Sequence, residues 1–224
     1  MAPILAYWNI RGLAEMSRLM MHYHGDTFED RQYVCGPAPD FDRSDWTSKK
    51  FTLGLAFPNL PYYIDGEFKI TQAQAILEFL ADKHDMIPFC KKRKAQLRML
   101  NNQVTDFRNS FVSLCYNPDY EKLVDGFKEK LADHLKAFEL YLTDKKWLDG
   151  KHINFPDFNL CELLNQLVLW DSKCLDAYPH LKAYLNRFEN LPNIKEYMES
   201  TEFRKRPCNN KQARWGSSAE IADQ

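Results

Sequence analysis

The residues that could do chemistry in this sequence are most concentrated between Asn59 and Ala73. Asp65-Gly66 separates two short runs of strand-forming residues, a pattern typical of a tight hairpin because glycine reaches positive φ without steric cost. A helix is predicted directly afterwards, over residues 73–83. Because the first N–H groups of a helix are unpaired and its dipole is positive there, this helix start would attract an anion.

A proline directly before the hairpin adds a second binding feature. Asn59-Leu60-Pro61 leads into the first hairpin strand, and we expect the Leu60–Pro61 peptide bond to be cis. That turn would leave the backbone of Leu60 available to pair with an extended ligand. Together with the helix start, the segment indicates a surface that binds a short anionic peptide in extended form.

The elements that must position this surface occupy the first 84 residues. Their predicted order is strand, helix, strand, loop with a short helix, two strands and helix, which matches the thioredoxin-like fold. The predicted ranges are 3–8, 14–24, 27–33, helical turns within 44–51, strands 62–64 and 68–70, and helix 73–83. The first strand ends in Tyr7-Trp8, for which core packing is the ordinary role, and no CxxC follows it, so dithiol exchange is excluded.

Helical patterns fill the rest of the chain after a linker at residues 85–89. We expect helices over 91–116, 119–142, 156–172 and 181–198, the last broken at Pro192. Asn154 and Asp157 flank a proline in the arrangement that starts a helix. The predicted fold class is therefore α/β plus all-α, with a thioredoxin-like N-terminal domain (1–84) followed by a C-terminal helical domain (90–224) whose tail from Arg204 is irregular.

Composition and charge exclude several other classes of protein. The 224 residues are 45% hydrophobic and 27% charged, as in a folded soluble protein, and a net charge of -1 gives no reason to expect nucleic acid. No run approaches the ~18 apolar residues of a membrane span, and the N-terminus lacks the features of a signal peptide. The widely separated cysteines argue against structural zinc and for reduced thiols in the cytoplasm. These are Cys35, Cys90, Cys115, Cys161, Cys174 and Cys208.

Several blocks of sequence resemble the glutathione transferases, and specifically the mu class, along nearly the whole chain. The blocks are PILAYWNIRGLAE, GPAPDFDRSDW, KKFTLGLAFPNLPYYIDGEFKITQ, CYNPDYEKL and KCLDAYPHLKAYLNRFENLP. The long insertion before Trp46 points to mu rather than to the other classes. The resemblance implies an enzyme that conjugates the thiolate of glutathione, as co-substrate and without a further cofactor or metal, to hydrophobic electrophiles in detoxification.

By this resemblance, Tyr7 is the catalytic residue and donates a hydrogen bond that activates the glutathione sulfur. Arg43 and Lys50 would face the glycyl carboxylate, Leu60 the cysteinyl backbone, and Gln72 the γ-glutamyl carboxylate. Asp106 would reach the ligand amine across a dimer interface, although a solvated helix charge is its ordinary role. The implied glutathione-binding set is Tyr7, Trp8, Leu13, Arg43, Trp46, Lys50, Asn59, Leu60, Gln72, Ala73 and Asp106.

The resemblance also implies an electrophile pocket and a homodimer. Tyr116 could donate a hydrogen bond to a developing oxyanion and would otherwise be part of the pocket wall. The implied pocket residues are Ile10, Leu13, Arg108, Val112, Tyr116, Asn210 and Trp215. Phe57 would insert into the partner subunit, unless it is an ordinary core phenylalanine.

Two positions depart from the mu pattern. The usual Gln-Ser pair is Gln72-Ala73 here, which predicts weaker glutathione binding. The mu class tends to place a basic residue at Glu78 and an acidic one at Arg98, so the signs are exchanged and mixed dimers with ordinary mu subunits would be disfavoured. A non-catalytic carrier of apolar ligands is the alternative function, to which Ala73 lends some weight.

Overall fold

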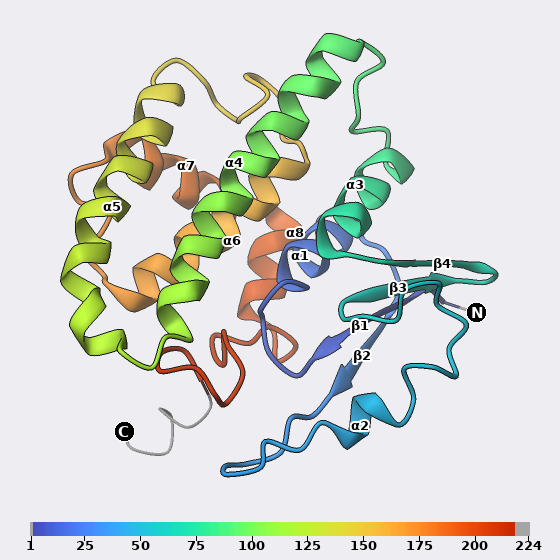
Figure 1. The fold of residues 1–224 in the computed structure, drawn as a ribbon. Coiled ribbons are helices and arrows are strands. Elements are labelled where there is room, and N and C mark those ends of the chain that lie inside the picture. The colour runs from blue at the N-terminus through green and yellow to red at the C-terminus, as the bar shows by residue number, and fades with distance from the viewer. Residues whose placement is uncertain (1, 218–224) are drawn as a thin grey trace.

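The computed structural model describes residues 2–217, and its first domain is built on a four-stranded sheet (Figure 1). The strands are β1 (Ile4–Trp8), β2 (Glu29–Tyr33), β3 (Tyr62–Asp65) and β4 (Phe68–Thr71), in the order β2-β1-β3-β4. β1 is parallel to β2 and antiparallel to β3, which itself forms the predicted hairpin with β4. This confirms the thioredoxin-like order.

The two faces of the sheet are covered by different helices. Leu5 and Tyr63 belong to the large core with α1 (Glu15–His24) and α3 (Ala73–Lys83), because alternate residues of a strand face opposite sides. Ala6 and Tyr62 belong to a smaller core that contains Trp46 of the short α2 (Ser44–Thr47). The smaller core also holds Tyr7.

The second domain is a helical bundle around α6 (Phe155–Trp170), which is buried along most of its length. The surrounding helices are α4 (Lys91–Cys115), α5 (Tyr120–Tyr141), α7 (Pro179–Glu189) and α8 (Pro192–Glu199). The predicted start signal of α6 is a capping box, in which the Asp157 side chain accepts from the Asn154 backbone N–H at 2.7 Å. The predicted break at Pro192 separates α7 from α8, since proline removes a helical N–H donor.

The C-terminal tail returns to the first domain, where it contacts the loop that follows β1. The backbone N–H groups of Arg11 and Gly12 donate to the carbonyls of Pro207 and Cys208, at 2.9 and 3.0 Å.

The predicted starts of β1 and β2 were early by one and two residues. The ladder begins at the pair Ile4 and Glu29, so pairing decides where both strands start.

Candidate active site

Tyr7 lies at the end of β1 with only 7% of its surface exposed. Burial raises the pKa of its phenol above the usual value, while the nearby backbone of Leu13 and the charges of Arg18 and Arg108 oppose that rise. The phenol therefore stays protonated at neutral pH. A protonated phenol has an O–H that it can donate to a ligand.

Gly12 holds this arrangement in place and was not singled out from the sequence. Its φ is +45°, and a Cβ there would lie 2.5 Å from Cε1 of the Tyr7 ring and 3.0 Å from its hydroxyl oxygen. Any side chain would therefore displace the phenol or the loop that carries Leu13. A glycine directly after a strand and turn is the signal that could have identified it.

The residues predicted to bind an extended peptide gather around the smaller core of the first domain. Trp46 and Leu60 are buried in the same core as Tyr7, and the Trp46 ring stacks on Tyr62. The Leu60–Pro61 bond is cis, as predicted. The N–H of Leu60 donates to Oδ1 of Asn59 at 2.9 Å, so a ligand that used this N–H would have to replace the side-chain contact.

Gln72 has an uncommon backbone conformation at the start of α3. Its φ of 77° lies in a region that residues other than glycine adopt only under strain, and such strain is concentrated at functional sites. The Gln72 side chain is exposed and makes no capping hydrogen bond, so the first N–H groups of α3 remain available to an anion. Ala73, the first helical residue, is 8% exposed. We call Tyr7, Trp46, Leu60 and Gln72 the Tyr7 face.

The charged and aromatic members of the predicted peptide-binding set lie at the edge of this face. Arg43 is exposed beside α2, and Lys50 is half-buried with its ammonium over the Phe51 ring, 4.7 Å from the centroid. Trp8 is half-buried at the end of β1. Their side chains are thus accessible to a ligand that extends from Tyr7.

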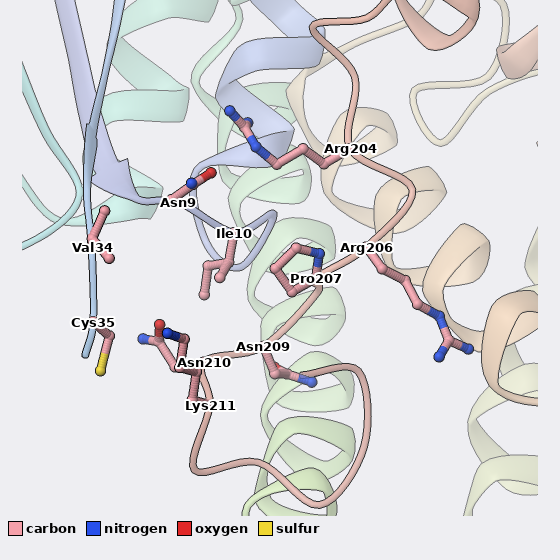
Figure 2. A pocket seen from close by; sticks show the side chains of 10 residues that line it. All are labelled: Asn9, Ile10, Val34, Cys35, Arg204, Arg206, Pro207, Asn209, Asn210 and Lys211. Carbon is pink, nitrogen blue, oxygen red and sulfur yellow. The ribbon is translucent and has the colours of Figure 1, made fainter. Parts of the chain in front are cut away.

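A cavity of about 440 Å³ lies between the loop after β1, the segment after β2 and the C-terminal tail (Figure 2). We call it the tail pocket. It is lined by Asn9, Ile10, Val34, Cys35, Arg204, Arg206, Pro207, Asn209, Asn210 and Lys211. Ile10 belongs to the same small core as Tyr7, so the pocket lies next to the phenol.

Tyr116 borders the tail pocket at the C-terminal end of α4. Its hydroxyl oxygen accepts a hydrogen bond of 2.7 Å from the backbone N–H of Asn210. Burial raises the pKa of this phenol to about 12, so its O–H is retained and can be donated to a ligand. Of the residues predicted for the electrophile pocket, Ile10 and Asn210 line the tail pocket, whereas Leu13 and Val112 are half-buried outside its lining.

Comparison with known proteins decides the family. Residues 3–82 match the family model described as "Glutathione S-transferase, N-terminal domain", and residues 105–201 match "Glutathione S-transferase, C-terminal domain". The chain belongs to the glutathione S-transferase family. It is 45% identical over 214 residues to Glutathione S-transferase Mu 3 of Homo sapiens, covering 96% of this chain and 95% of the relative. It is 46% identical to Glutathione S-transferase Mu 2 of Pongo abelii, covering 97% and 100%.

Solved structures agree with this assignment. This transferase resembles the crystal structure of the glutathione S-transferase Blo t 8 with a TM-score of 0.81 and 32% identity, over 95% of this chain and 99% of that one. It resembles the Pi-class glutathione S-transferase of Onchocerca volvulus with a TM-score of 0.84 and 29% identity, over 96% and 100%. The predicted family, mu class and fold class are thus confirmed.

Arg108 of this transferase lies in the interior, whereas the sequence predicted it on the pocket wall. It is 2% exposed, and its guanidinium donates to Asn159 Oδ1 at 2.9 Å and lies 3.4 Å from Glu162 Oε2. Glu162 also binds Arg11, with Nε and Oε1 3.1 Å apart. A buried cation needs such partners, and α6 supplies them; Arg108 can act on Tyr7 through its charge but does not line the tail pocket.

The interior network around Glu162 was missed from the sequence. It continues from Asn159 to Asn101 at 3.0 Å and from Asn101 to Gln74 on α3 at 2.7 Å. Trp215 is buried and is outside the lining of the tail pocket; its ring packs on Phe111 with centroids 5.2 Å apart. These residues are outside the lining of the tail pocket.

The residues predicted to contact a partner subunit lie on the surface. Phe57 is 79% exposed, and its carbonyl accepts from the Thr71 hydroxyl at 3.1 Å. Glu78 on α3 and Arg98 on α4 bind each other within the chain, with Nε and Oε1 2.8 Å apart. Asp106 is exposed on α4.

Across residues 2–217, no helix combines the length and apolar character needed to cross a membrane. Within the same residues, no group of three or more His, Cys, Asp or Glu side chains is arranged to hold a metal ion.

Proposed function

We propose that this protein conjugates the thiolate of glutathione to hydrophobic electrophiles, a detoxification reaction, with Tyr7 as the catalytic residue. The sulfur attacks the electrophilic carbon, the bond to the leaving group breaks, and that group departs with the electron pair. The thiol proton is released, so that RX and glutathione give the thioether and HX. One observation carries the proposal: the Tyr7 phenol is buried and its pKa is raised, so at neutral pH it keeps an O–H that it can donate to sulfur.

The free energy needed to lower the pKa of the glutathione thiol is about what one hydrogen bond to a charged group supplies. A thiol pKa near ~8.5 leaves only a few per cent thiolate at neutral pH, and lowering it by about two units needs roughly 2.7 kcal/mol. A hydrogen bond to a charged group contributes about 1.5–3 kcal/mol. Burial of the phenol strengthens this contact, because water competes less for the O–H.

Glutathione would lie along the Tyr7 face. Its γ-glutamyl carboxylate would meet Gln72 and the N–H of Ala73, while its glycyl carboxylate would face Arg43 and Lys50. Trp8, Trp46 and Asn59 would complete the site around the backbone of Leu60, and the backbone of Leu13 lies near the Tyr7 phenol. Residues 1–84 and 90–224 are proposed as the two domains.

We further propose a cytoplasmic homodimer, in which Phe57 inserts into the partner and Asp106 reaches the partner's glutathione. The large exposed fractions of Phe57 (79%), Met99 (59%) and Leu140 (66%) support an apolar contact surface. Glu78 and Arg98 have charges opposite to those usual at these positions, so pairing with an ordinary mu subunit would oppose like charges. Native mass spectrometry of mixed subunits should yield homodimers, and abundant mixed dimers would contradict this.

Conjugation of glutathione to a chlorodinitrobenzene tests the main proposal. Release of the coloured thioether should be accelerated well above the uncatalysed rate, and Tyr7→Phe should remove most of the acceleration. A carrier of apolar ligands would bind the aryl halide without turnover. Binding with no turnover would therefore favour the carrier over the enzyme.

A further inference from the structure

The tail pocket is more basic than the cavity expected for purely hydrophobic electrophiles. Between Phe203 and Ser218 the chain carries five cations and no acidic residue, namely Arg204, Lys205, Arg206, Lys211 and Arg214. Three of them line the pocket, together with the amides of Asn9, Asn209 and Asn210. No carboxylate is among the described residues that line it.

Arg204 has a donor that no protein group satisfies. Its Nη1 is buried and makes no hydrogen bond, and its ion pair with Oδ2 of Asp30 is long, at 3.7 Å. Both oxygens of Asp30 already accept hydrogen bonds, from Arg18 at 3.0 Å and from Gln32 at 2.8 Å. A buried donor without a partner is costly, and an acceptor brought by a ligand would remove that cost.

The rest of the pocket suits an apolar body. Figure 2 shows Ile10 and Pro207 on one side of the cavity, Val34 and Cys35 across from them, and Arg204 at its upper rim. The guanidinium of Arg206 points away from this space and lies over the Trp215 ring, 5.5 Å from its centroid. The cationic character of the cavity therefore depends on Arg204 and Lys211.

We propose that the preferred electrophiles of this transferase carry an anionic group, such as a carboxylate, on an apolar body. The anion would bind near Arg204 and Lys211 while the body lies between Ile10 and Val34, next to Tyr7. This inference rests on the proposed function, since it assigns the electrophile class of the same site.

A matched pair of substrates tests the inference. Both are chloronitrobenzenes with a substituent para to chlorine, a carboxylate in one and a neutral carboxamide in the other. In each reaction the C–S bond forms, the C–Cl bond breaks and chloride leaves with the electron pair. Because the substituents activate the ring differently, kcat/KM is divided by the uncatalysed rate constant with glutathione. We expect the carboxylate to be favoured by about tenfold, and less in roughly 0.5 M salt because the charges are then screened.

Substitutions of the two pocket cations show which residues cause the preference for the carboxylate substrate. Arg204→Gln and Lys211→Gln should each lower kcat/KM for the carboxylate about fivefold and change that for the carboxamide by less than about twofold. Lys205→Gln is the matched control, because this exposed cation lies on the same tail outside the pocket lining and should change neither value. The inference would be overturned if the unaltered protein accelerated both substrates equally, or if each variant lowered kcat/KM for the carboxylate and for the carboxamide by the same factor.

A binding measurement separates this inference from the proposed function. If neither substrate is turned over, the proposed function fails, and titration calorimetry with the two glutathione thioethers still measures the preference. A carboxylate thioether that binds about tenfold more tightly, with the difference reduced in Arg204→Gln, supports the anionic site. Equal dissociation constants would overturn it.

Discussion

The Tyr7 face and the tail pocket adjoin each other but are built in different ways. Tyr7, Trp46, Leu60 and Gln72 come from the first 72 residues and are held by β1, β3 and the start of α3. The tail pocket combines the loop after β1, the segment after β2 and residues 204–211. Backbone hydrogen bonds between segments almost 200 residues apart, such as Arg11 to Pro207, hold it together.

The difference matches what each region has to recognise. In the proposed function glutathione is the constant ligand, and a sheet and a helix terminus would present backbone groups to it in a rigid arrangement. Electrophiles vary, and loops accept substitutions without loss of the fold. Changes in the tail pocket should therefore alter substrate choice, while changes at the Tyr7 face should affect all substrates alike.

The largest expected effect is that of Glu162→Gln, which tests whether the two regions share one interior support. The substitution would leave the buried Arg11 and Arg108 without their common carboxylate, so we expect a loss of about 3–5 kcal/mol in unfolding free energy. Denaturant unfolding measures this. Asp176→Asn, which removes an exposed ion pair with Lys182, is the control and should leave the unfolding free energy nearly unchanged, because water screens this pair.

The same carboxylate predicts a pH dependence. Although burial opposes its charge, Arg11 and Arg108 hold the pKa of Glu162 below its usual value. Its stabilising contribution is therefore complete above about pH 4.5, the range of an unfolded glutamate, and is lost as the pH falls through the lower folded pKa. The unfolding free energy of Glu162→Gln should lack this acid-dependent loss, and parallel profiles for the two proteins would contradict the pairing.

Tyr7→Phe should lower turnover by about a hundredfold with every electrophile, because about 2.7 kcal/mol of thiolate stabilisation is lost. The thiolate absorbance of bound glutathione should titrate about two pH units higher than in the unaltered protein. Burial raises the pKa of Tyr7, so the unaltered enzyme should keep its activity up to about pH 9. If Tyr7→Phe lost activity with only one class of electrophile, Tyr7 would act on the electrophile in the tail pocket rather than on the glutathione sulfur.

Ala73→Ser should lower the KM for glutathione by about tenfold, since the added hydroxyl can donate to the γ-glutamyl carboxylate. The KM for the electrophile should not change, because the substitution lies at the Tyr7 face. Ala75→Ser is the matched control on the same helix, at an exposed position, and should leave both values unaltered. An unchanged glutathione KM in Ala73→Ser would rule out a role for this position.

The smallest effect is expected for Tyr116→Phe and should depend on the substrate. Epoxides and enones develop an oxyanion to which Tyr116 can donate, so their kcat should fall by about fivefold to tenfold. Aryl halides should react within about twofold of the unaltered rate, because they develop no such oxyanion near this hydroxyl. Steady-state kinetics with one substrate of each class would decide, and equal losses would indicate that Tyr116 serves only as pocket wall.

Several elements of both domains could be predicted because their signals are local. The Asp65-Gly66 hairpin, the cis bond before Pro61 and the capping box at Asn154 each depend on residues within four positions of one another. The placement of Arg108 could not be predicted in this way. Its partner Glu162 is 54 residues away, and the helical pattern around Arg108 does not distinguish an interior cation from a pocket wall.

By itself, the amino-acid sequence determined the order of strands and helices and the turn before the hairpin. These features follow from backbone preferences and short-range hydrogen bonds, which neighbouring residues specify. The tertiary structure decided that Tyr7 is buried, that Gly12 must lack a side chain and that the tail closes a basic pocket. Those outcomes depend on how distant segments pack, and packing brings together groups whose separation along the chain carries no information about their distance in space.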